Sequence, residues 1–268
     1  MLDSTSRFAD RYGPWAVVTG ASSGIGREFA RELAALGLNV VLVARNESEL
    51  KTLAEELVTQ HGIEARSLAM DLSQPSASHE LDLSTIDLDV GLLVANAGFG
   101  SAGTFLELDL DEQTNMLDLN CRALMQQTHR FANRMQTRNQ SGIIHLSSIV
   151  AFQGMPHAAH YAATKAYVQV FAESLRSEFS SLGIDVLAVA PGPTKTGFSS
   201  RASLVMSSAM SPSIVAQSSI KKLGRTTTTM PGFQSKLLGL PIRMLPRFLR
   251  IQIMGNVGKG MVREKAAV

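Results

Sequence analysis

The stretch Trp15-Ala16-Val17-Val18-Thr19-Gly20-Ala21-Ser22-Ser23-Gly24-Ile25-Gly26 decides the fold. It begins with an apolar run rich in β-branched side chains, which predicts a buried strand. Apolar residues then recur at helical spacing over 27–36, and Gly37 ends that pattern. The glycines between strand and helix let the backbone approach a ligand, and the free N–H groups at the helix start favour a phosphate. A turn that only connects the two elements is the weaker alternative.

The alternation of strands and helices continues along the chain and predicts an α/β fold. The predicted strands are 15–19, 39–44, 64–70, 90–95, 142–148 and 184–190, with a final strand within 226–231, and the predicted helices are 27–36, 47–61, 111–138 and 161–182. We expect only a short connection before 90–95, and residues 194–219 lack a clear period and suit a covering over a pocket. Such alternation means a doubly wound parallel sheet with helices on both faces, whose ligands bind beyond the C-terminal strand ends.

Arg45 follows the second predicted strand, 19 positions after Gly26. In dinucleotide-binding folds an acid near this position binds the free 2′-hydroxyl of the adenosine ribose. A guanidinium instead suits a 2′-phosphate. Arg45 therefore favours NADP(H) over NAD(H), and the alternative is a surface arginine that opens the next helix.

A tyrosine and a lysine four residues apart begin the last long predicted helix. Tyr161 and Lys165 lie one turn apart on one helix face. A neighbouring ammonium lowers the pKa of a phenol, so the pair could exchange a proton with a substrate oxygen near neutral pH. Alone, this spacing is more typical of a solvated face, and the support comes from the glycine turn and the strand ends.

Composition and charge narrow the class of protein. Of the 268 residues, 45% are hydrophobic and 18% are charged, which fits one large globular domain. The net charge of +2 is uneven, because residues 221–268 hold 10 Lys and Arg side chains and one acid, Glu264. We therefore expect residues 1–220 to form the cofactor-binding and catalytic domain, and residues 221–268 to form a basic, apolar extension of it.

Other chemistries and a membrane span find little support. Cys121 is the single cysteine, which excludes an intrachain disulfide and fits a reducing compartment. The N-terminus is polar and no apolar run approaches the ~18 residues of a spanning helix, so we expect a cytoplasmic protein. His157 and His160 lack the further ligands of a metal site, and no Gly-x-Ser-x-Gly elbow indicates a hydrolase.

Five motifs occur in the order typical of one known family. They are Thr19-Gly20-x-x-x-Gly24-x-Gly26, Asn96-Ala97-Gly98, Asn120, Ser148 with Tyr161-x-x-x-Lys165, and Pro191-Gly192 with Thr196. With these motifs, residues 14–198 resemble the classical short-chain dehydrogenase/reductase family. Ala95 departs from that family's Asn-Asn-Ala-Gly element, on the adenine side and away from the chemistry. The resemblance implies a single Rossmann-type sheet of about seven strands.

The resemblance also implies NADP(H) as cofactor, no metal, and a role for each site residue. Tyr161 would protonate a substrate carbonyl oxygen, Ser148 would orient that oxygen, and Lys165 would hold the nicotinamide ribose and lower the pKa of Tyr161. Asn120 would hold a water that connects Lys165 to solvent, and Asp71 would bind the adenine amine. The cofactor contacts it implies are Gly20, Ser22, Ser23, Gly24, Ile25, Arg45, Asp71, Asn96, Tyr161, Lys165 and Thr196.

We expect an NADP(H)-dependent oxidoreductase that interconverts a carbonyl and an alcohol. The residues that suggest an apolar substrate, such as a ketoacyl, steroid-like or aryl ketone, are Phe99, Phe152, Met155 and Phe198. The alternatives on the same fold are a non-catalytic NADP(H)-sensing protein and a membrane-surface protein. The first predicts loss of Tyr161 or Lys165, and both are present. We expect no nucleic-acid partner and, by analogy with the family, a homodimer or homotetramer.

The basic extension has two interpretations. Residues 236–255 mix large apolar side chains with Lys236 and several arginines, and Pro241 and Pro246 break them into short pieces. Such a segment could lie on the inner face of an anionic membrane or hold an acyl substrate. Alternatively, the tail packs on the domain or across an oligomer interface, which is the interpretation that we favour.

Overall fold

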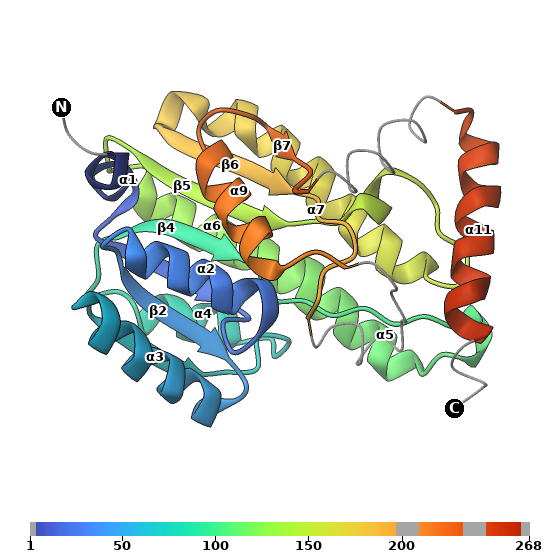
Figure 1. Ribbon diagram of the computed structural model, residues 1–268, viewed down its shortest axis with the longest axis horizontal. Helices are drawn as coiled ribbons and strands as arrows, with labels where there is room; N and C mark the ends of the chain where they lie inside the picture. Colours follow the sequence, from blue (N-terminus) through green and yellow to red (C-terminus); the bar gives the residue numbers. More distant parts are fainter. Residues whose placement is uncertain (1–3, 197–208, 233–244, 264–268) are drawn as a thin grey trace.

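The computed structural model describes residues 4–196, 209–232 and 245–263, which form a layered α/β fold (Figure 1). A seven-stranded sheet lies in the middle, in the order β3-β2-β1-β4-β5-β6-β7, and every pairing is parallel. The strand order reverses between β1 and β4, and ligands of such sheets bind at this reversal. The predicted doubly wound parallel sheet is confirmed.

Apolar runs form the strands, as expected where helices cover both faces of a sheet. The strands are β1 (Trp15–Thr19), β2 (Asn39–Ala44), β3 (Ala65–Ala69), β4 (Val90–Ala95), β5 (Ser141–Leu146), β6 (Ile184–Val189) and β7 (Thr228–Thr229). Every residue of the central strands β4 and β5 is buried. β7 is short and pairs with β6, within the range where the sequence predicts a final strand.

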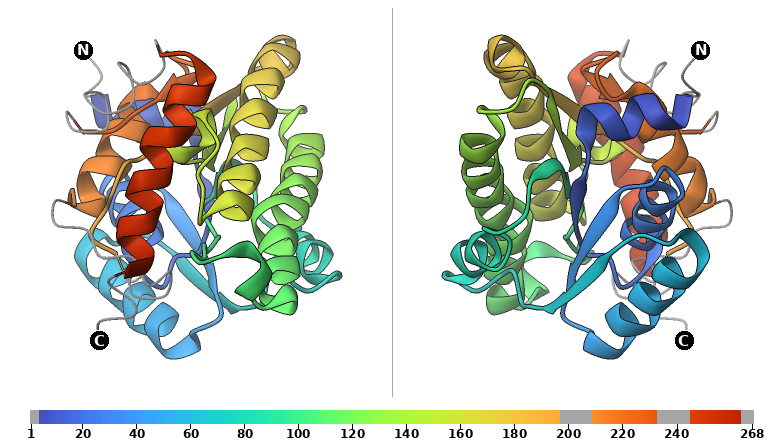
Figure 2. Two further views of the ribbon diagram at one scale, coloured as in Figure 1. Left: turned by 90° about the vertical axis from the view of Figure 1, so that its right-hand side faces the viewer. Right: turned by 90° about the vertical axis from the view of Figure 1, so that its left-hand side faces the viewer.

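Helices cover the two faces of the sheet (Figure 2). The first face carries α1 (Ser4–Tyr12), α2 (Gly24–Ala35), α3 (Glu47–His61) and α9 (Pro212–Lys222). The second face carries α4 (Ala77–Leu83), α6 (Leu124–Met135) and α7 (Ala159–Glu178). Successive strand side chains point to opposite faces, so Val18 joins the first apolar core and Val17 joins the second. The site therefore rests on a sheet that is held from both sides.

Shorter helical segments and a C-terminal helix complete the described chain. They are η1 (Phe105–Glu107), α5 (Leu110–Leu117), the π-helical η2 (Asp118–Ala123), η3 (Ile149–Phe152), η4 (Phe179–Leu182) and α11 (Arg247–Arg263). No described helix combines the length and the apolar character that a transmembrane span requires.

Several helices differ from the sequence predictions. α4 occupies the stretch predicted as a short connection, and α9 occupies the end of the segment predicted to lack a period. The π-turn η2 interrupts the single helix predicted for 111–138. α11 begins after Pro246 and continues without a break, where the sequence predicts short pieces. Of the basic apolar segment 236–255, residues 236–244 lie outside the described residues, and the part within α11 packs on the domain through Met254.

Candidate active site

A cavity of about 820 Å³ lies at the C-terminal edge of the sheet. Residues that follow β1 to β5 line it, together with the loop after β6. Its lining includes every residue predicted to contact the cofactor, namely Gly20, Ser22, Ser23, Gly24, Ile25, Arg45, Asp71, Asn96, Tyr161, Lys165 and Thr196. Ser148 also lines the cavity, whereas Asn120 does not.

The turn between β1 and α2 has glycine where a side chain would collide. Gly24 has a left-handed φ of 57°, and a Cβ there would lie 2.8 Å from Thr196 Cγ2. A Cβ at Gly26 would collide with the carbonyl oxygen of Gly20. The N-cap residue Ser23 makes no side-chain cap bond to α2. The first N–H groups of α2 therefore approach the cavity without a side-chain cap, as an anion site requires.

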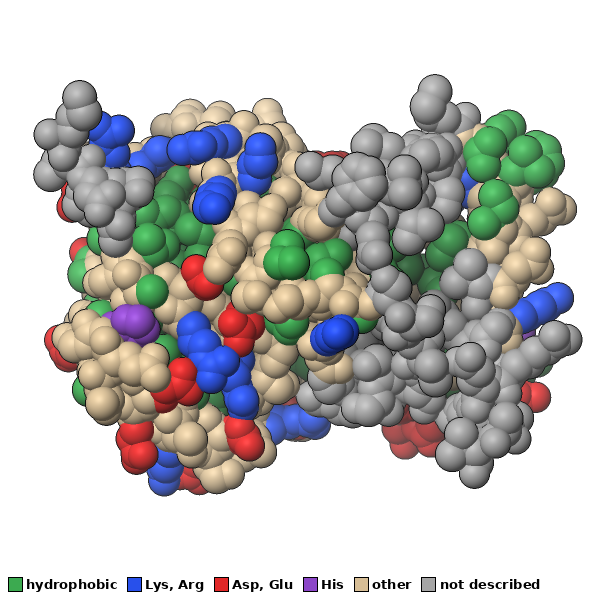
Figure 3. All heavy atoms as spheres, viewed as in Figure 1, with side chains coloured by type: hydrophobic (Ala, Val, Ile, Leu, Met, Phe, Trp, Pro, Cys, Tyr) green, Lys and Arg blue, Asp and Glu red, His purple; other side chains and the backbone are tan. Residues whose placement is uncertain are grey.

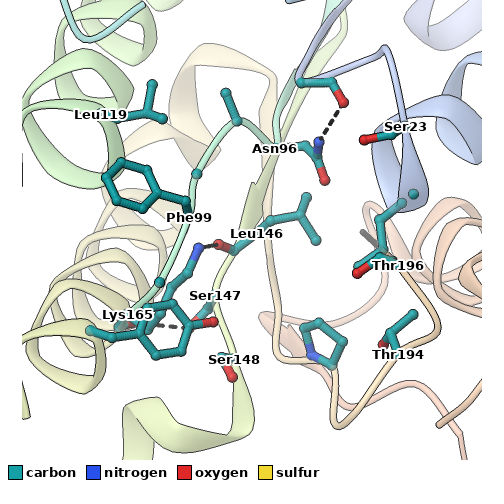
Figure 4. Close-up of a pocket in the computed structure, with 18 of the residues that line it drawn as sticks. Ser23, Asn96, Phe99, Leu119, Leu146, Ser147, Ser148, Lys165, Thr194 and Thr196 are labelled. Carbon is teal, nitrogen blue, oxygen red and sulfur yellow. Dashed lines mark hydrogen bonds between the residues drawn. The ribbon is translucent and has the colours of Figure 1, made fainter. Parts of the chain in front are cut away.

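Asn96 fastens this turn to β4 (Figure 4). Its amide nitrogen donates to the carbonyl oxygen of Thr19 at 2.8 Å, and its backbone N–H donates to Thr19 Oγ1 at 3.0 Å. Thr19 Oγ1 in turn donates to the carbonyl oxygen of Val94 at 3.3 Å. The side-chain nitrogen of Asn96 thus holds two central strands together where they end at the cavity.

Arg45 and Asp71 bring charge to the part of the cavity beyond β2 and β3. Asp71 accepts hydrogen bonds from the backbone N–H and the hydroxyl of Ser73, at 3.1 and 2.8 Å. Burial acts to raise the pKa of Asp71, but these bonds and the charge of Arg45 hold it below its usual value. Arg27 is paired with Glu49. Arg45 is exposed and has no hydrogen bond or ion pair with any residue that the structure describes, so its guanidinium is available to a ligand.

Tyr161 lies in the first turn of α7, and Ser148 follows β5 by two positions. A hydrogen bond joins their side chains. Burial raises the pKa of Tyr161 to about 12, and the bond with Ser148 lowers it by less. Lys165 Nζ lies 6.0 Å from the centre of the Tyr161 ring. In the protein alone, desolvation of the phenolate outweighs the bond with Ser148. The expected lowering of this pKa by Lys165 stays a prediction.

Lys165 is buried one turn after Tyr161 and bonds to the end of β5. Its Nζ donates to the carbonyl oxygen of Leu146 at 2.8 Å, and its own carbonyl oxygen accepts from Ser147 Oγ at 3.0 Å (Figure 4). Burial lowers the pKa of Lys165 to about 8. The helix that carries Tyr161 is therefore fixed to the strand that carries Ser148. The Leu146 carbonyl is a part of this site that the motifs did not indicate.

Asn120 lies behind the cavity, inside the π-turn, and is 1% exposed. Its amide nitrogen donates to the Phe99 carbonyl at 2.9 Å and to Thr164 Oγ1 at 3.0 Å, and its oxygen accepts from the Phe99 N–H at 3.1 Å. Both amide hydrogens are used within the protein, so the amide nitrogen has no hydrogen left for the predicted water. These contacts instead support a positioning role, since Asn120 joins the loop after β4 to α7. π-Turns recur at functional sites.

The end of the cavity next to Tyr161 is apolar. Its lining includes Phe99, Met155, Ile253 and Met254. Phe99 and Met155 are where the sequence predicts them, Phe152 is not among the lining residues, and Phe198 lies outside the described residues. The two α11 residues fall within the segment 236–255, for which the sequence offers contact with an acyl substrate as one interpretation, but the sequence does not single them out. Gly255 and Gly258, which follow them, were the sequence feature that could have indicated a helix packed closely against the domain.

The parallel sheet, with a glycine turn where its strand order reverses, defines a Rossmann-type dinucleotide-binding protein. A family model described as short chain dehydrogenase matches residues 14–204. The 7beta-hydroxysteroid dehydrogenase of Clostridium sardiniense is 31% identical over 229 residues, which cover 84% of this chain and 88% of that protein. The very-long-chain 3-oxoacyl-CoA reductase of Aspergillus clavatus is 38% identical over 178 residues, which cover 65% of this chain and 52% of the fungal protein.

Solved structures are similar over most of the chain. A structure from a study of 7beta-hydroxysteroid dehydrogenase stereoselectivity has a TM-score of 0.86 at 25% identity, covering 92% of this chain and 98% of that one. A short-chain dehydrogenase from Sphingobium yanoikuyae in complex with NADPH has a TM-score of 0.79 at 28% identity, covering 85% of this chain and 92% of that one. The chain belongs to the short-chain dehydrogenase/reductase family, as its motifs predict, and it is an oxidoreductase of that family.

Proposed function

We propose that this protein is an NADP(H)-dependent oxidoreductase that interconverts a carbonyl and an alcohol on an apolar substrate. The observation that carries the proposal is the hydrogen-bonded pair of Tyr161 and Ser148, with Lys165 buried one turn away, in the same cavity as the glycine turn. The cofactor would supply or accept the hydride. Tyr161 would give its phenolic proton to the substrate oxygen in reduction and take it back in oxidation, while Ser148 donates a hydrogen bond to that oxygen.

Lys165 and Asn120 would act on this pair from the protein side. A phenol with a pKa near 12 holds its proton firmly at neutral pH, so it starts reduction in the correct, protonated form. The buried Lys165 ammonium lies where it can stabilise the phenolate that remains after transfer. Asn120 would hold the loop at Phe99 in a fixed position relative to helix α7.

The residues around the glycine turn fit NADP(H). A Cβ at Gly24 or Gly26 would fill space beside the uncapped start of α2, where a pyrophosphate would bind. Arg45, which has no ion pair with a residue that the structure describes, suits the 2′-phosphate, and Asp71 would accept from the adenine amine. The NADPH complex of the Sphingobium relative supports this choice.

An apolar substrate is favoured by the charges around the cavity. Among the described residues, the charged side chains that line it are Arg27, Arg45, Glu49, Asp71 and Lys165. Only Lys165 belongs to the end that holds Tyr161 and Met155, and its Nζ already donates to the Leu146 carbonyl. Among the described residues, that end has no acidic side chain and no other basic one, which disfavours a charged substrate group. Relatives named for hydroxysteroids and for 3-oxoacyl-CoA support a bulky or long apolar body.

Nucleotide titration tests the cofactor assignment. Arg45→Ala should weaken NADPH binding by about tenfold or more, because a charge-assisted hydrogen bond contributes roughly 1.5–3 kcal/mol. NADH binding should change by less than about threefold, since NADH lacks the 2′-phosphate. Fluorescence titration of both nucleotides checks this, with the exposed Arg225→Ala as the matched control. An unchanged preference for NADPH in Arg45→Ala would remove Arg45 from this role.

A further inference from the structure

The C-terminal helix α11 stands apart from the helices that cover the sheet. It lies at one end of the molecule, beside the segment that joins β5 to α7 (Figures 1 and 2). That segment ends at Ala158, immediately before α7 and three residues before Tyr161. Ile253 and Met254 of α11 line the cavity. This helix therefore borders the part of the cavity where the proposed reaction takes place.

Two glycines let α11 approach this segment closely. A Cβ at Gly258 would collide with the carbonyl oxygen of Pro156 and lie 3.5 Å from His157 Cβ. A Cβ at Gly255 would lie 3.3 Å from Pro156 Cγ. The two glycines are three residues apart, so they share one face of the helix. Gly154 adds a contact from the other side, because a Cβ there would lie 3.4 Å from Ile251 Cγ1.

The close approach places Met254 inside the protein. Met254 is 7% exposed and forms an apolar cluster whose other buried members are Ala102, Met155, Ala158 and Ala162. Ala162 is the neighbour of Tyr161 in the first turn of α7. The same cluster is tied to the loop after β4, because the Gly103 N–H donates to the His157 carbonyl at 2.8 Å. Three of these four neighbours are alanines, so Met254 reaches the end of the cavity next to Tyr161 without a large side chain between it and α7 other than Met155.

Of the basic side chains of α11 that the structure describes, none lines the cavity. Arg247 and Lys259 are exposed, and Arg250 donates to the carbonyl oxygen of Leu245 at 2.7 Å. Apolar side chains also gather on the outer surface at the start of α11, where Phe248 is 63% exposed (Figure 3). Among its described side chains, α11 therefore lines the cavity with Ile253 and Met254, both apolar.

We propose that α11 is a docked wall of the substrate site and that Met254 is its specificity-determining residue. Gly255 and Gly258 hold the wall against Pro156, and Met254 limits the size of the neutral, apolar group that a ketone can carry on the side facing α11. A flexible thioether adapts to irregular apolar shapes, so substitutions that change its volume should move the size limit. This inference rests on the proposed carbonyl reduction and deepens it.

The first test compares ketone reduction in variants at position 254. The probes are neutral ketones of increasing bulk, from acetophenone to a tetracyclic ketosteroid, each assayed with NADPH. Met254→Ala should raise the ratio of kcat/KM for the bulky over the small ketone by about tenfold, and Met254→Phe should lower it by a similar factor, since each methylene in an apolar pocket changes discrimination roughly 10-fold or more. Phe248→Ala is the control on the exposed side of the same helix and should leave the ratio unchanged.

The second test measures docking without turnover. Gly258→Val should increase amide hydrogen exchange in α11 and in residues 154–158, because its side chain collides with Pro156. Asn256→Val is the matched control, since Asn256 is exposed on the same helix. NADPH binding should stay within about threefold in both variants, which also checks that they fold; if Gly258→Val fails to fold, the milder Gly258→Ala takes its place.

The outcomes separate this inference from the proposed reaction. If the wild type reduces none of the ketones, the proposed reaction is wrong, and the exchange experiment still decides whether α11 is docked through Gly258. If the wild type is active and the Met254 variants keep its ratio of bulky to small ketones, Met254 does not select the substrate. Equal exchange in Gly258→Val and Asn256→Val would overturn the docked wall.

Discussion

Tyr161 and Lys165 share one face of α7, and burial favours the uncharged form of both side chains. It raises the pKa of Tyr161 to about 12 and lowers that of Lys165 to about 8. At neutral pH the protein without cofactor therefore holds a protonated phenol, and the nearby ammonium loses its proton more readily than an exposed lysine does. A proton donor for a carbonyl oxygen needs this protonated form, and the cation one turn away would stabilise the product phenolate.

The hydrogen bonds of Asn120 predict how its loss affects stability and activity. Asn120→Ala removes three hydrogen bonds and takes their partner from the backbone N–H and carbonyl of Phe99, while Thr164 Oγ1 keeps its bond to the Tyr161 carbonyl. We expect a loss of roughly 1–3 kcal/mol in the free energy of unfolding, and a lower kcat with a nucleotide Kd that changes little. Urea unfolding and steady-state kinetics measure the two effects. Asn115→Ala, on the preceding helix, is the control, and equal behaviour of the two variants would contradict the positioning role.

At the scale of elements, the first half of the fold follows from local sequence. The bounds predicted for β1, β2, α3 and β4 agree with the structure, because each is a long apolar or periodic run between turn residues. α4 is short and polar, so its few buried residues give no clear period. α9 has its signal in the cap Ser211 and in Pro212 at its start, rather than in its period. The π-turn depends on contacts with other elements, which local patterns do not contain.

The part of the candidate site that binds the cofactor could also be predicted from local sequence. Most cofactor positions came from a strand end or the glycine turn, and parallel strands bring their C-terminal ends to one edge. Tyr161 and Lys165 came from the helix motif, and Thr196 came from the loop after Pro191-Gly192. The docking of α11 could not be predicted, because the close approach of Gly258 to Pro156 is a contact between segments far apart in the sequence. The spacing to Lys165 also does not reveal how deeply the Tyr161 phenol is buried, and this burial raises its pKa.

The close packing of the β1–α2 turn predicts that a side chain at Gly26 disturbs both stability and cofactor binding. Gly26→Ala places a methyl group against the Gly20 carbonyl, so we expect a loss of roughly 1–3 kcal/mol in stability and weaker binding of NADPH. Gly37→Ala is the matched control, because Gly37 has a left-handed φ of 82° and no atom within 4 Å of an added Cβ. It should lose some stability and bind NADPH normally. NADPH binding that stays normal in Gly26→Ala would refute the close approach as a requirement of the site.

For the whole molecule, the two apolar cores on either side of the sheet decide stability, and one of them surrounds a titratable group. His145 of β5 is completely buried, 2.8 Å from Thr128 Oγ1 of α6 and near the ring of Phe171 in α7. Burial lowers its pKa from 6.5 to about 3. Between these two values the unfolded chain binds a proton that the folded protein does not, so stability falls as the pH falls through this range.

This linkage gives a measurable pH dependence. From pH 7 to pH 5, His145 should account for a loss of about 2 kcal/mol in the free energy of unfolding. His145→Gln keeps a nitrogen near Thr128 and does not titrate. Between pH 7 and pH 5, its free energy of unfolding should therefore fall by about 2 kcal/mol less than that of the wild type. Urea unfolding of both proteins at the two pH values measures the difference. The same loss in both proteins would mean that His145 is not the group that titrates.

The central claim is that Tyr161 gives the proton to a carbonyl oxygen at this cavity. The most direct measurement is the rate of NADPH oxidation in a single turnover with a saturating neutral ketone, for the wild type and for Tyr161→Phe, with the NADPH Kd determined for both. We expect Tyr161→Phe to lower the rate by about 100-fold or more and to leave the NADPH Kd within about twofold. A Tyr161→Phe protein that oxidises NADPH at the wild-type rate would contradict it.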